Sequence, residues 1–450
     1  MLRKLLAQLF YCKFICYNRS PKSFTLGNNM EQVKSSVSLK RAWLVCFVAS
    51  LFFLFEFIQL SSFDALNNII TQRFNLNASE LSLLGSSILW GDVIFLFPAG
   101  FFLDRFGARK AILSSLFLSV LGILIFSMSN SFLLAFIARF MTGIGLAFCF
   151  IALVVLVSRW FPSRKQAFVM GALVNMAFLG GMFAHTPLIM LLHKFGWQHV
   201  MQANVLFGLG LLILVYGTVY DYPPQLEAVF KQQAKQEVGL LASLKYIVNK
   251  QNIAAGLFTS CLNLPIMVLC ALWGMQYLQI VHHFDTYNAS NAISMIFLGS
   301  MVGSPLAGFL SDKIQKRKTI MWIGAICSLI LASCLVLPGL VLSPLSMMSL
   351  FFALGLFSAA QVLSYPLIAE SNLLQYSGRA CSIASLIIMS GGTVAQIIFG
   401  YLLRFKDPSS TVLSIEKFQF AMYLFPASML IAIFAICIIK ETNCRLSMES

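Results

Sequence analysis

The sequence has few charged residues for its length. Of its 450 residues only 10% are charged, whereas 59% are hydrophobic, and the mean hydropathy is +0.84. A soluble domain carries roughly 25% charged residues, so most of the surface of this chain does not face water. The shortage of charge excludes soluble enzymes, secreted disulfide scaffolds and disordered proteins. It indicates a chain that lies in a membrane.

Motifs for catalysis and for metal binding are also absent from the sequence. There is no G-x-x-x-x-G-K-[ST] phosphate loop, no H-E-x-x-H pair and no nucleophile elbow. The 11 cysteines are scattered, odd in number and without a C-x-x-C pair, which is typical of packing residues. We therefore expect neither an enzyme nor a cofactor, and no work driven by ATP hydrolysis in this chain.

What the sequence does contain is a series of long apolar runs. A helix needs about 20 mainly apolar residues to cross a bilayer, and twelve runs fit. They are residues 42–62, 81–103, 109–128, 131–156, 166–190, 199–220, 252–279, 287–311, 318–337, 344–367, 379–404 and 417–439. We predict an all-α membrane protein with twelve transmembrane helices.

The basic residues indicate how these helices are oriented. The net charge is +15, which could suggest a nucleic-acid partner. If both ends of the chain are cytoplasmic, however, 25 of the 31 Lys and Arg residues fall in cytoplasmic segments and only five fall on the other side. This is the positive-inside rule. We expect the lipid bilayer as partner, no nucleic acid, and a bacterial inner membrane as the location.

The spans divide the chain into five parts. We expect a cytoplasmic N-terminal segment at 1–41, a six-helix bundle at 42–220, a cytoplasmic loop at 221–251, a second six-helix bundle at 252–439 and a tail at 440–450. The basic, apolar beginning lacks a small-residue cleavage site, so a cleaved signal peptide is not expected. We favour Met30 as the start of translation.

A repeat relates the two bundles. Residues 100–110 read GFFLDRFGARK and residues 308–318 read GFLSDKIQKRK, an offset of 208. The first copy holds Gly100, Asp104, Arg105, Gly107, Arg109 and Lys110, and the second holds Gly308, Asp312, Arg317 and Lys318. We call both copies the loop motif. Each follows an even-numbered span, so the bundles are predicted to be parallel repeats, as in transporters that bind substrate between their halves.

At these residues the chain resembles the major facilitator superfamily. The first copy fits that family's signature G-x-x-x-D-R-x-G-x-R-K, and Arg139-Phe-Met-Thr-Gly143-Ile-Gly145, Arg159-Trp-Phe-Pro162 and Gly180-Gly181 are further matches. The second copy departs from the signature, because Gln315 replaces the second glycine. The resemblance implies alternating access, with spans 1, 4, 7 and 10 around the substrate cavity and with the loop motif as a lock.

The loop motif also has a direct physical interpretation. Gly100 permits close packing of helices, and Gly107 permits a tight turn that a side chain would obstruct. Asp104 could accept hydrogen bonds from a helix N-terminus or pair with an arginine. We expect Asp104 to gate the carrier. The alternative is that Arg105, Arg109 and Lys110 only fix topology.

Three charged residues lie inside predicted spans, where charge is costly. They are Glu56 in span 1, Asp92 in span 2 and Arg139 in span 4. Counted from the outer ends of their helices they lie about 10–16 Å deep. Our hypothesis is that Glu56 carries a coupling proton, with Asp92 as second candidate, and that a Glu56–Arg139 pair changes protonation as substrate comes and goes. The alternative is a structural ion pair or polar packing.

Further polar side chains in the spans are candidates for the cavity lining. They are Gln59, Asn263, Trp273, Gln276 and Gln361. Trp273 could stack on substrate, although a packing role is equally compatible with its sequence position.

The expected function is secondary active transport by a monomer. Span 1 and the segments FPAGFFLDRFGARK and RWFPSRKQA look like a branch of the superfamily that holds amino-acid and nucleoside carriers of intracellular bacteria and is related to lysosomal dipeptide carriers. We therefore favour proton-coupled uptake of an amino acid or short peptide. The alternatives are proton-driven efflux of a drug or siderophore, and a membrane sensor that does not transport.

Overall fold

Every regular element that the structure describes is a helix. The computed structural model describes residues 38–161, 163–223, 248–337, 342–372, 374–405 and 413–443. The predicted N-terminal segment up to residue 37 and most of the predicted central loop lie outside these ranges. Among the described residues, eleven helices are long and apolar enough to cross a membrane. This confirms the predicted all-α membrane class.

The described residues of the first half form seven helices. They are α3 (Leu39–Ala65), α4 (Asn67–Phe74), α5 (Ala78–Phe106), α6 (Ala108–Met128), α7 (Phe132–Trp160), α8 (Ser163–Phe183) and α9 (Thr186–Thr218). The α5 helix begins with a capping box, in which Asn77 accepts from the backbone of Glu80 and Glu80 accepts from the backbone of Asn77.

The described residues of the second half form α-helices together with one π-helix and one 3₁₀-helix. Its elements are α12 (Lys250–Leu264), the π-helix η1 (Pro265–Trp273), α13 (Gly274–Val281), α14 (Thr286–Ile314), α15 (Arg317–Cys334), α16 (Pro344–Ser358), the 3₁₀-helix η2 (Ala359–Leu363), α17 (Ser364–Ser371), α18 (Leu374–Phe405), α19 (Ile415–Met422) and α20 (Leu424–Ile438). The predicted seventh span is thus α12, η1 and α13, and the predicted tenth is α16, η2 and α17.

The structure differs from the predicted spans around His185. The predicted span 166–190 stops early, because α8 ends at Phe183 and α9 starts at Thr186, where Pro187 occupies the first turn. Within α9 the backbone leaves helical geometry at Gly196, with φ 76° and ψ 168°. The short helix α4 was not predicted, since its sequence NNIITQRF is too polar and too short for a span.

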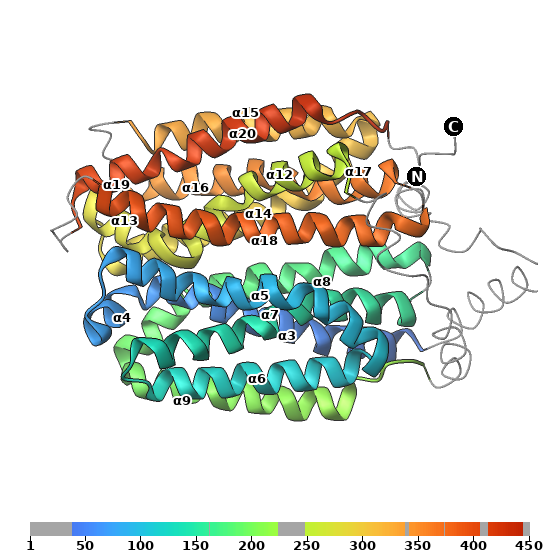
Figure 1. Cartoon of the computed structure of the whole chain (residues 1–450), viewed down its shortest axis with the longest axis horizontal. Helices are drawn as coiled ribbons and strands as arrows, with labels where there is room; N and C mark the ends of the chain where they lie inside the picture. Colours follow the sequence, from blue (N-terminus) through green and yellow to red (C-terminus); the bar gives the residue numbers. More distant parts are fainter. Residues whose placement is uncertain are drawn as a thin grey trace, which may run out of the picture.

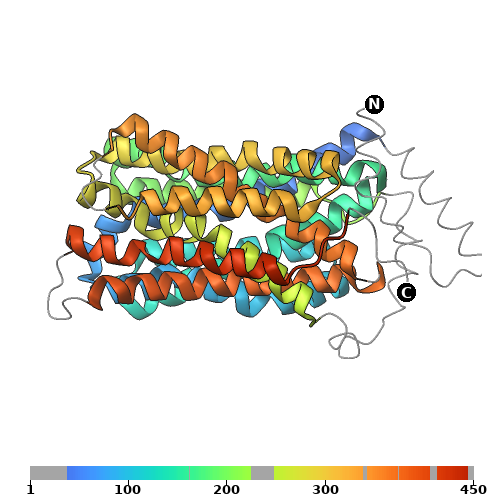
Figure 2. The same cartoon turned by 90° about the horizontal axis from the view of Figure 1, so that it is seen from above.

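The helices run side by side along the long axis of the molecule, and those of the first and second halves lie next to each other (Figure 1). Across this junction α5 packs on α18, α8 packs on α14 and α3 packs on η1. The first residues of α3 and the last of α20 lie at one end of the bundle, as the view from above also shows (Figure 2). We call this the basic end, because both loop motifs lie there, and the opposite end the α4 end.

The surface of the bundle is apolar. Large hydrophobic side chains are exposed on many helices, for example Phe97 at 66%, Ile213 at 75% and Leu345 at 75%. Such a surface would aggregate in water. It fits the hydrocarbon core of a bilayer, so the few buried polar groups become the functional candidates.

Candidate functional site

Glu56 is buried inside the first half. Its Oε1 accepts a hydrogen bond of 2.6 Å from the hydroxyl of Ser119 on α6, whereas its Oε2 has no partner. A Cβ added at Gly145 of α7 would collide with this carboxyl and with Ser119. The glycine therefore makes room for the acid between α3, α6 and α7.

Asp92 is the second buried carboxyl of this region. It is 2% exposed, and its Oδ2 has no hydrogen-bond partner. Asp92 interacts electrostatically with Glu56 and, across the junction of the halves, with Tyr365 of α17. Neither carboxyl forms an ion pair with a described basic residue, so the first half holds two neighbouring acids without a counter-ion.

The predicted Glu56–Arg139 pair is absent from the described structure. Arg139 stacks on the ring of Phe63 at 4.3 Å and donates to the carbonyl of Gln59 at 3.3 Å. Its Nε and Nη2 have no partner. The two side chains lie at different heights along α7. Glu56 of α3 lies beside Gly145 of α7, and Arg139 comes six residues before Gly145 on α7, which corresponds to about 9 Å along the helix axis.

The other predicted cavity residues are spread over several places. Gln59 exchanges hydrogen bonds with Asn204 of α9. Asn263 is nine-tenths buried in α12, and the backbone carbonyl of Gln361 in η2 accepts from Thr259. Trp273 is fully buried against Phe399 and Phe418, which makes it a packing residue in this conformation and not a substrate platform.

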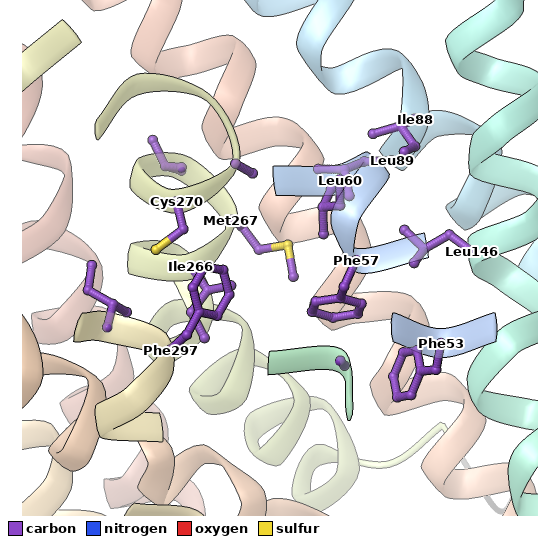
Figure 3. Close-up of a cluster of buried hydrophobic side chains, with 14 of the residues drawn as sticks. Phe53, Phe57, Leu60, Ile88, Leu89, Leu146, Ile266, Met267, Cys270 and Phe297 are labelled. Carbon is purple, nitrogen blue, oxygen red and sulfur yellow. The ribbon is translucent and has the colours of Figure 1, made fainter. Parts of the chain in front are cut away.

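Where the halves meet in the middle of the bundle, the side chains are apolar. Figure 3 shows Met267 of η1 pointing toward Phe57 of α3, with Phe53 and Leu60 on the same helix as Phe57 and with Ile266 of η1 and Phe297 of α14 beside Met267. The described hydrogen bonds between the halves lie nearer the α4 end.

At the α4 end, polar side chains join the halves. Both carboxylate oxygens of Asp64 accept from the backbone N–H of Met275 at 3.1 Å, and Asn67 donates to the carbonyl of Leu272 at 2.5 Å. Gln276 donates to Asn68 at 3.2 Å. Sequence reasoning found Gln276 but missed Asp64 and Asn67, because it ended the first span at residue 62.

At the basic end, the first loop motif contacts the segment that follows α9. Gly107 has φ 86°, and a Cβ there would lie 2.8 Å from the Asp221 carboxyl. Asp221 accepts from the backbone N–H of Arg109 at 3.0 Å and pairs with Arg159 at 3.5 Å. The predicted turn at Gly107 is confirmed. Asp221, which the sequence analysis did not single out, caps α6.

Other residues of the first loop motif make fewer contacts with the rest of the protein. Arg105 and Lys110 are exposed. A Cβ at Gly100 or at Gly308 would meet nothing within 4 Å, so the close packing predicted at Gly100 is wrong for this conformation: the position faces open space. The Asp104 side chain lies outside the described part of the structure, and its gating role stays a prediction.

The second loop motif forms a denser cluster. Arg317 is 2% exposed and donates to Asp312 at 2.6 Å and to Glu370 of α17 at 2.8 Å. Glu441 accepts from the backbone N–H groups of Arg317 and Lys318 at 2.9 and 2.8 Å. The two halves therefore share a capping arrangement. Asp221, which follows α9, caps α6, and Glu441, which follows α20, caps α15.

The profile of the Major Facilitator Superfamily matches residues 45–396, and a second match covers residues 292–442. The chain belongs to this superfamily. It is therefore a multi-pass membrane transporter and not an enzyme, which confirms the resemblance seen in the loop motif.

Individual relatives are distant. The probable sulfoacetate transporter SauU of Cupriavidus necator is 21% identical over 387 residues, covering 81% of this chain and 88% of the relative. The D-galactonate transporter of Escherichia coli is 24% identical, with 74% and 83% covered. Among solved structures, a D-xylose-proton symporter aligns with TM-score 0.70 and 17% identity, covering 91% of this chain and 99% of that one.

Proposed function

We propose that this transporter takes up a small organic anion together with protons, and that Glu56 carries the coupling proton with Asp92 as its neighbour. The observation that supports the proposal most strongly is the pair of buried carboxyls without a basic partner. A buried carboxylate without a counter-ion is costly, and the cost falls when the group takes up a proton.

The location of Glu56 suits a carried proton. Ser119 can donate to the ionised acid, and the free Oε2 can hold a proton without breaking that bond. Asp92 interacts with Glu56 and also with Tyr365 of the other half.

Arg139 supports an anionic substrate. Arg139 is 6% exposed, lacks a carboxylate partner among the described residues and keeps two N–H-bearing nitrogens free. A buried guanidinium is most stable with an anion. Sulfoacetate, named for one relative, and galactonate, named for another, are both anions. An amino acid or short peptide is the second candidate, since it also carries a carboxylate.

The orientation of the bundle in the membrane is inferred from the arrangement of charge. The positive-inside rule places the basic end in the cytoplasm, so the halves are joined at the outer, α4 end. We infer that the structure is closed toward the outside, that residues 42–220 and 252–439 move as two bundles, and that protons and solute enter from outside. The inner membrane of a bacterium and a monomeric carrier remain part of this proposal.

The coupling role is tested in proteoliposomes with an imposed proton gradient. Glu56→Gln should abolish substrate accumulation and retain exchange of labelled for unlabelled substrate, because only the gradient-driven half of the cycle needs the proton. Asp92→Asn should lower accumulation less. Glu80→Gln is a matched control, since Glu80 is an exposed capping acid whose glutamine replacement can still cap α5.

Normal accumulation by Glu56→Gln would refute the coupling role. The substrate class is tested separately, by growth rescue of a deletion strain on sulfonates, sugar acids, amino acids and peptides, with a drug-susceptibility panel beside it. Rescue by an acid with unchanged susceptibility supports uptake of anions. Altered susceptibility without rescue would favour efflux, and failure of labelled solute to cross in any assay would favour a sensor.

A further inference from the structure

A cavity of about 290 Å³ lies between the halves at the α4 end. Asp64 and the amide residues Asn67, Asn68, Gln276 and Gln279 line it, together with apolar side chains of α9 and with His193. Asp64 and Asn67 are each 1% exposed and Gln276 is 5% exposed. Three of the polar lining residues are therefore buried, whereas Asn68 is exposed and Gln279 is half-buried.

In this cavity the buried atoms without a hydrogen-bond partner are amide oxygens and not amide nitrogens. Each amide NH2 group already donates to the protein: Asn67 to Leu272, Asn68 to Gln279, Gln276 to Asn68 and Gln279 to Thr286. Two amide oxygens, Oδ1 of Asn67 and Oε1 of Gln276, are buried without a partner. A buried acceptor without a donor is costly.

The same cavity contains one carboxyl group, that of Asp64. Asp64 accepts the N–H of Met275 on both oxygens, and a carboxylate has about four acceptor positions in total, so each oxygen retains a lone pair. The described basic side chain of the lining is the exposed His193, which stacks on Tyr287. An anion would meet the carboxyl of Asp64 and two unpaired amide oxygens here.

We propose that this cavity binds a monovalent cation, either a metal ion such as Na⁺ or an ammonium group. Asp64 supplies the charge, and Asn67 and Gln276 supply neutral oxygens, the ligand type that hard cations prefer. The site is separate from the Arg139 region and independent of the proposed substrate. The adjacent π-helix η1 fits such a role, because irregular helix segments at bundle interfaces form ion sites in transporters.

The ligands come from both halves of the molecule. Asp64 and Asn67 belong to the first half, at the end of α3 and the start of α4, and Gln276 lies on α13 of the second half. A cation held by Asp64, Asn67 and Gln276 together needs α13 in contact with α3. Its affinity would therefore be higher for this arrangement than for one in which the two helices are apart. Occupation of the site would therefore stabilise the structure described here.

The test is the midpoint of thermal unfolding of the purified full-length protein in detergent at constant pH. Equal ionic strengths of NaCl, KCl, methylammonium chloride and choline chloride are compared, with choline as the bulky reference that has no N–H group. We expect a saturable rise over choline. A rise with a metal salt identifies a metal-ion site, and a rise with methylammonium alone identifies an ammonium site.

Two variants should weaken this response. Asp64→Asn removes the charge and Gln276→Leu removes a free oxygen, and each should raise the half-saturating concentration at least about tenfold. Gln279→Leu is the matched control, because its amide lines the same cavity but has both ends paired. Equal midpoints of the native protein in all four salts would overturn the proposal, as would an undiminished response in both Asp64→Asn and Gln276→Leu.

Discussion

The two ends of the helix bundle use polar side chains in opposite ways. At the α4 end, hydrogen bonds run between the halves: Asp64 to Met275, Asn67 to Leu272 and Thr186 to Ser290. At the basic end, the described ion pairs stay within one half, Arg159 with Asp221 and Arg317 with Glu370. In the proposed transport cycle, the first arrangement closes the outer side. The second braces each half as a unit that can move.

The two braces at the basic end also differ in strength. Arg317 and its partners are buried, with side-chain exposures of 2% for the arginine, 9% for Asp312 and 12% for Glu370. The Arg159–Asp221 pair is longer, at 3.5 Å, and its exposures are 14% and 23%. Buried pairs are expensive to break, whereas water-accessible pairs contribute little.

The largest effect is expected from breaking the buried brace. Arg317→Ala leaves the carboxylates of Asp312 and Glu370 buried without their cation, which should cost about 3–5 kcal/mol of stability. The measurement is reversible unfolding of the protein in detergent. Lys313→Ala removes an exposed positive charge from the same motif and should stay near the native value; an equal loss in both variants would contradict the assignment.

A smaller effect is expected at the gate. Asp64→Ala removes the acceptor of the Met275 N–H, and a hydrogen bond to a charged group is worth about 1.5–3 kcal/mol. The equilibrium should therefore move toward an outward-open form by roughly tenfold or more. A cysteine introduced at the buried cavity residue Ile189 should react faster with an impermeant thiol reagent added outside. Unchanged reactivity would show that Asp64 does not hold the gate.

The smallest effect on stability is expected from the partly exposed Arg159–Asp221 ion pair. Asp221→Asn keeps an acceptor for the Arg109 N–H and loses only the charge opposite Arg159, so stability should fall by less than about 1 kcal/mol. Reactivity of the cysteine at position 189 should not change. A loss as large as that of Arg317→Ala would mean that the two braces are equivalent.

The fold could be predicted from the sequence because bilayer thickness and the distribution of Lys and Arg are strong constraints on a chain of this composition. The predicted ends of the helices were wrong where a few local residues, and not overall hydropathy, determine where a helix starts or stops. Thr186-Pro187 restarts a helix inside the predicted fifth span, and the polar helix Asn67–Phe74 gives no hydropathy signal.

The candidate site was only partly predictable. The sequence singles out Glu56, Asp92 and Arg139 as buried charges, and the structure buries all three. Their pairing could not be predicted, because depth along a helix does not tell which neighbour a side chain faces. Asp64 was missed for a related reason: it lies at the end of a span, where a carboxylate ordinarily meets water, and only the start of α13 opposite it explains its burial.

The π-helix η1 has a geometric consequence for the gate. Hydrogen bonds in a π-helix join residues five apart, so Pro265–Trp273 holds more residues per turn than the α-helices on either side. The phase of α13 relative to α12 is therefore set by the hydrogen-bond register of η1. Tightening that register to the α pattern would turn α13 about its axis and carry Met275 and Gln276 away from Asp64 and Asn68, so that the outer gate could open by rotation of one short helix while α12 stays in place.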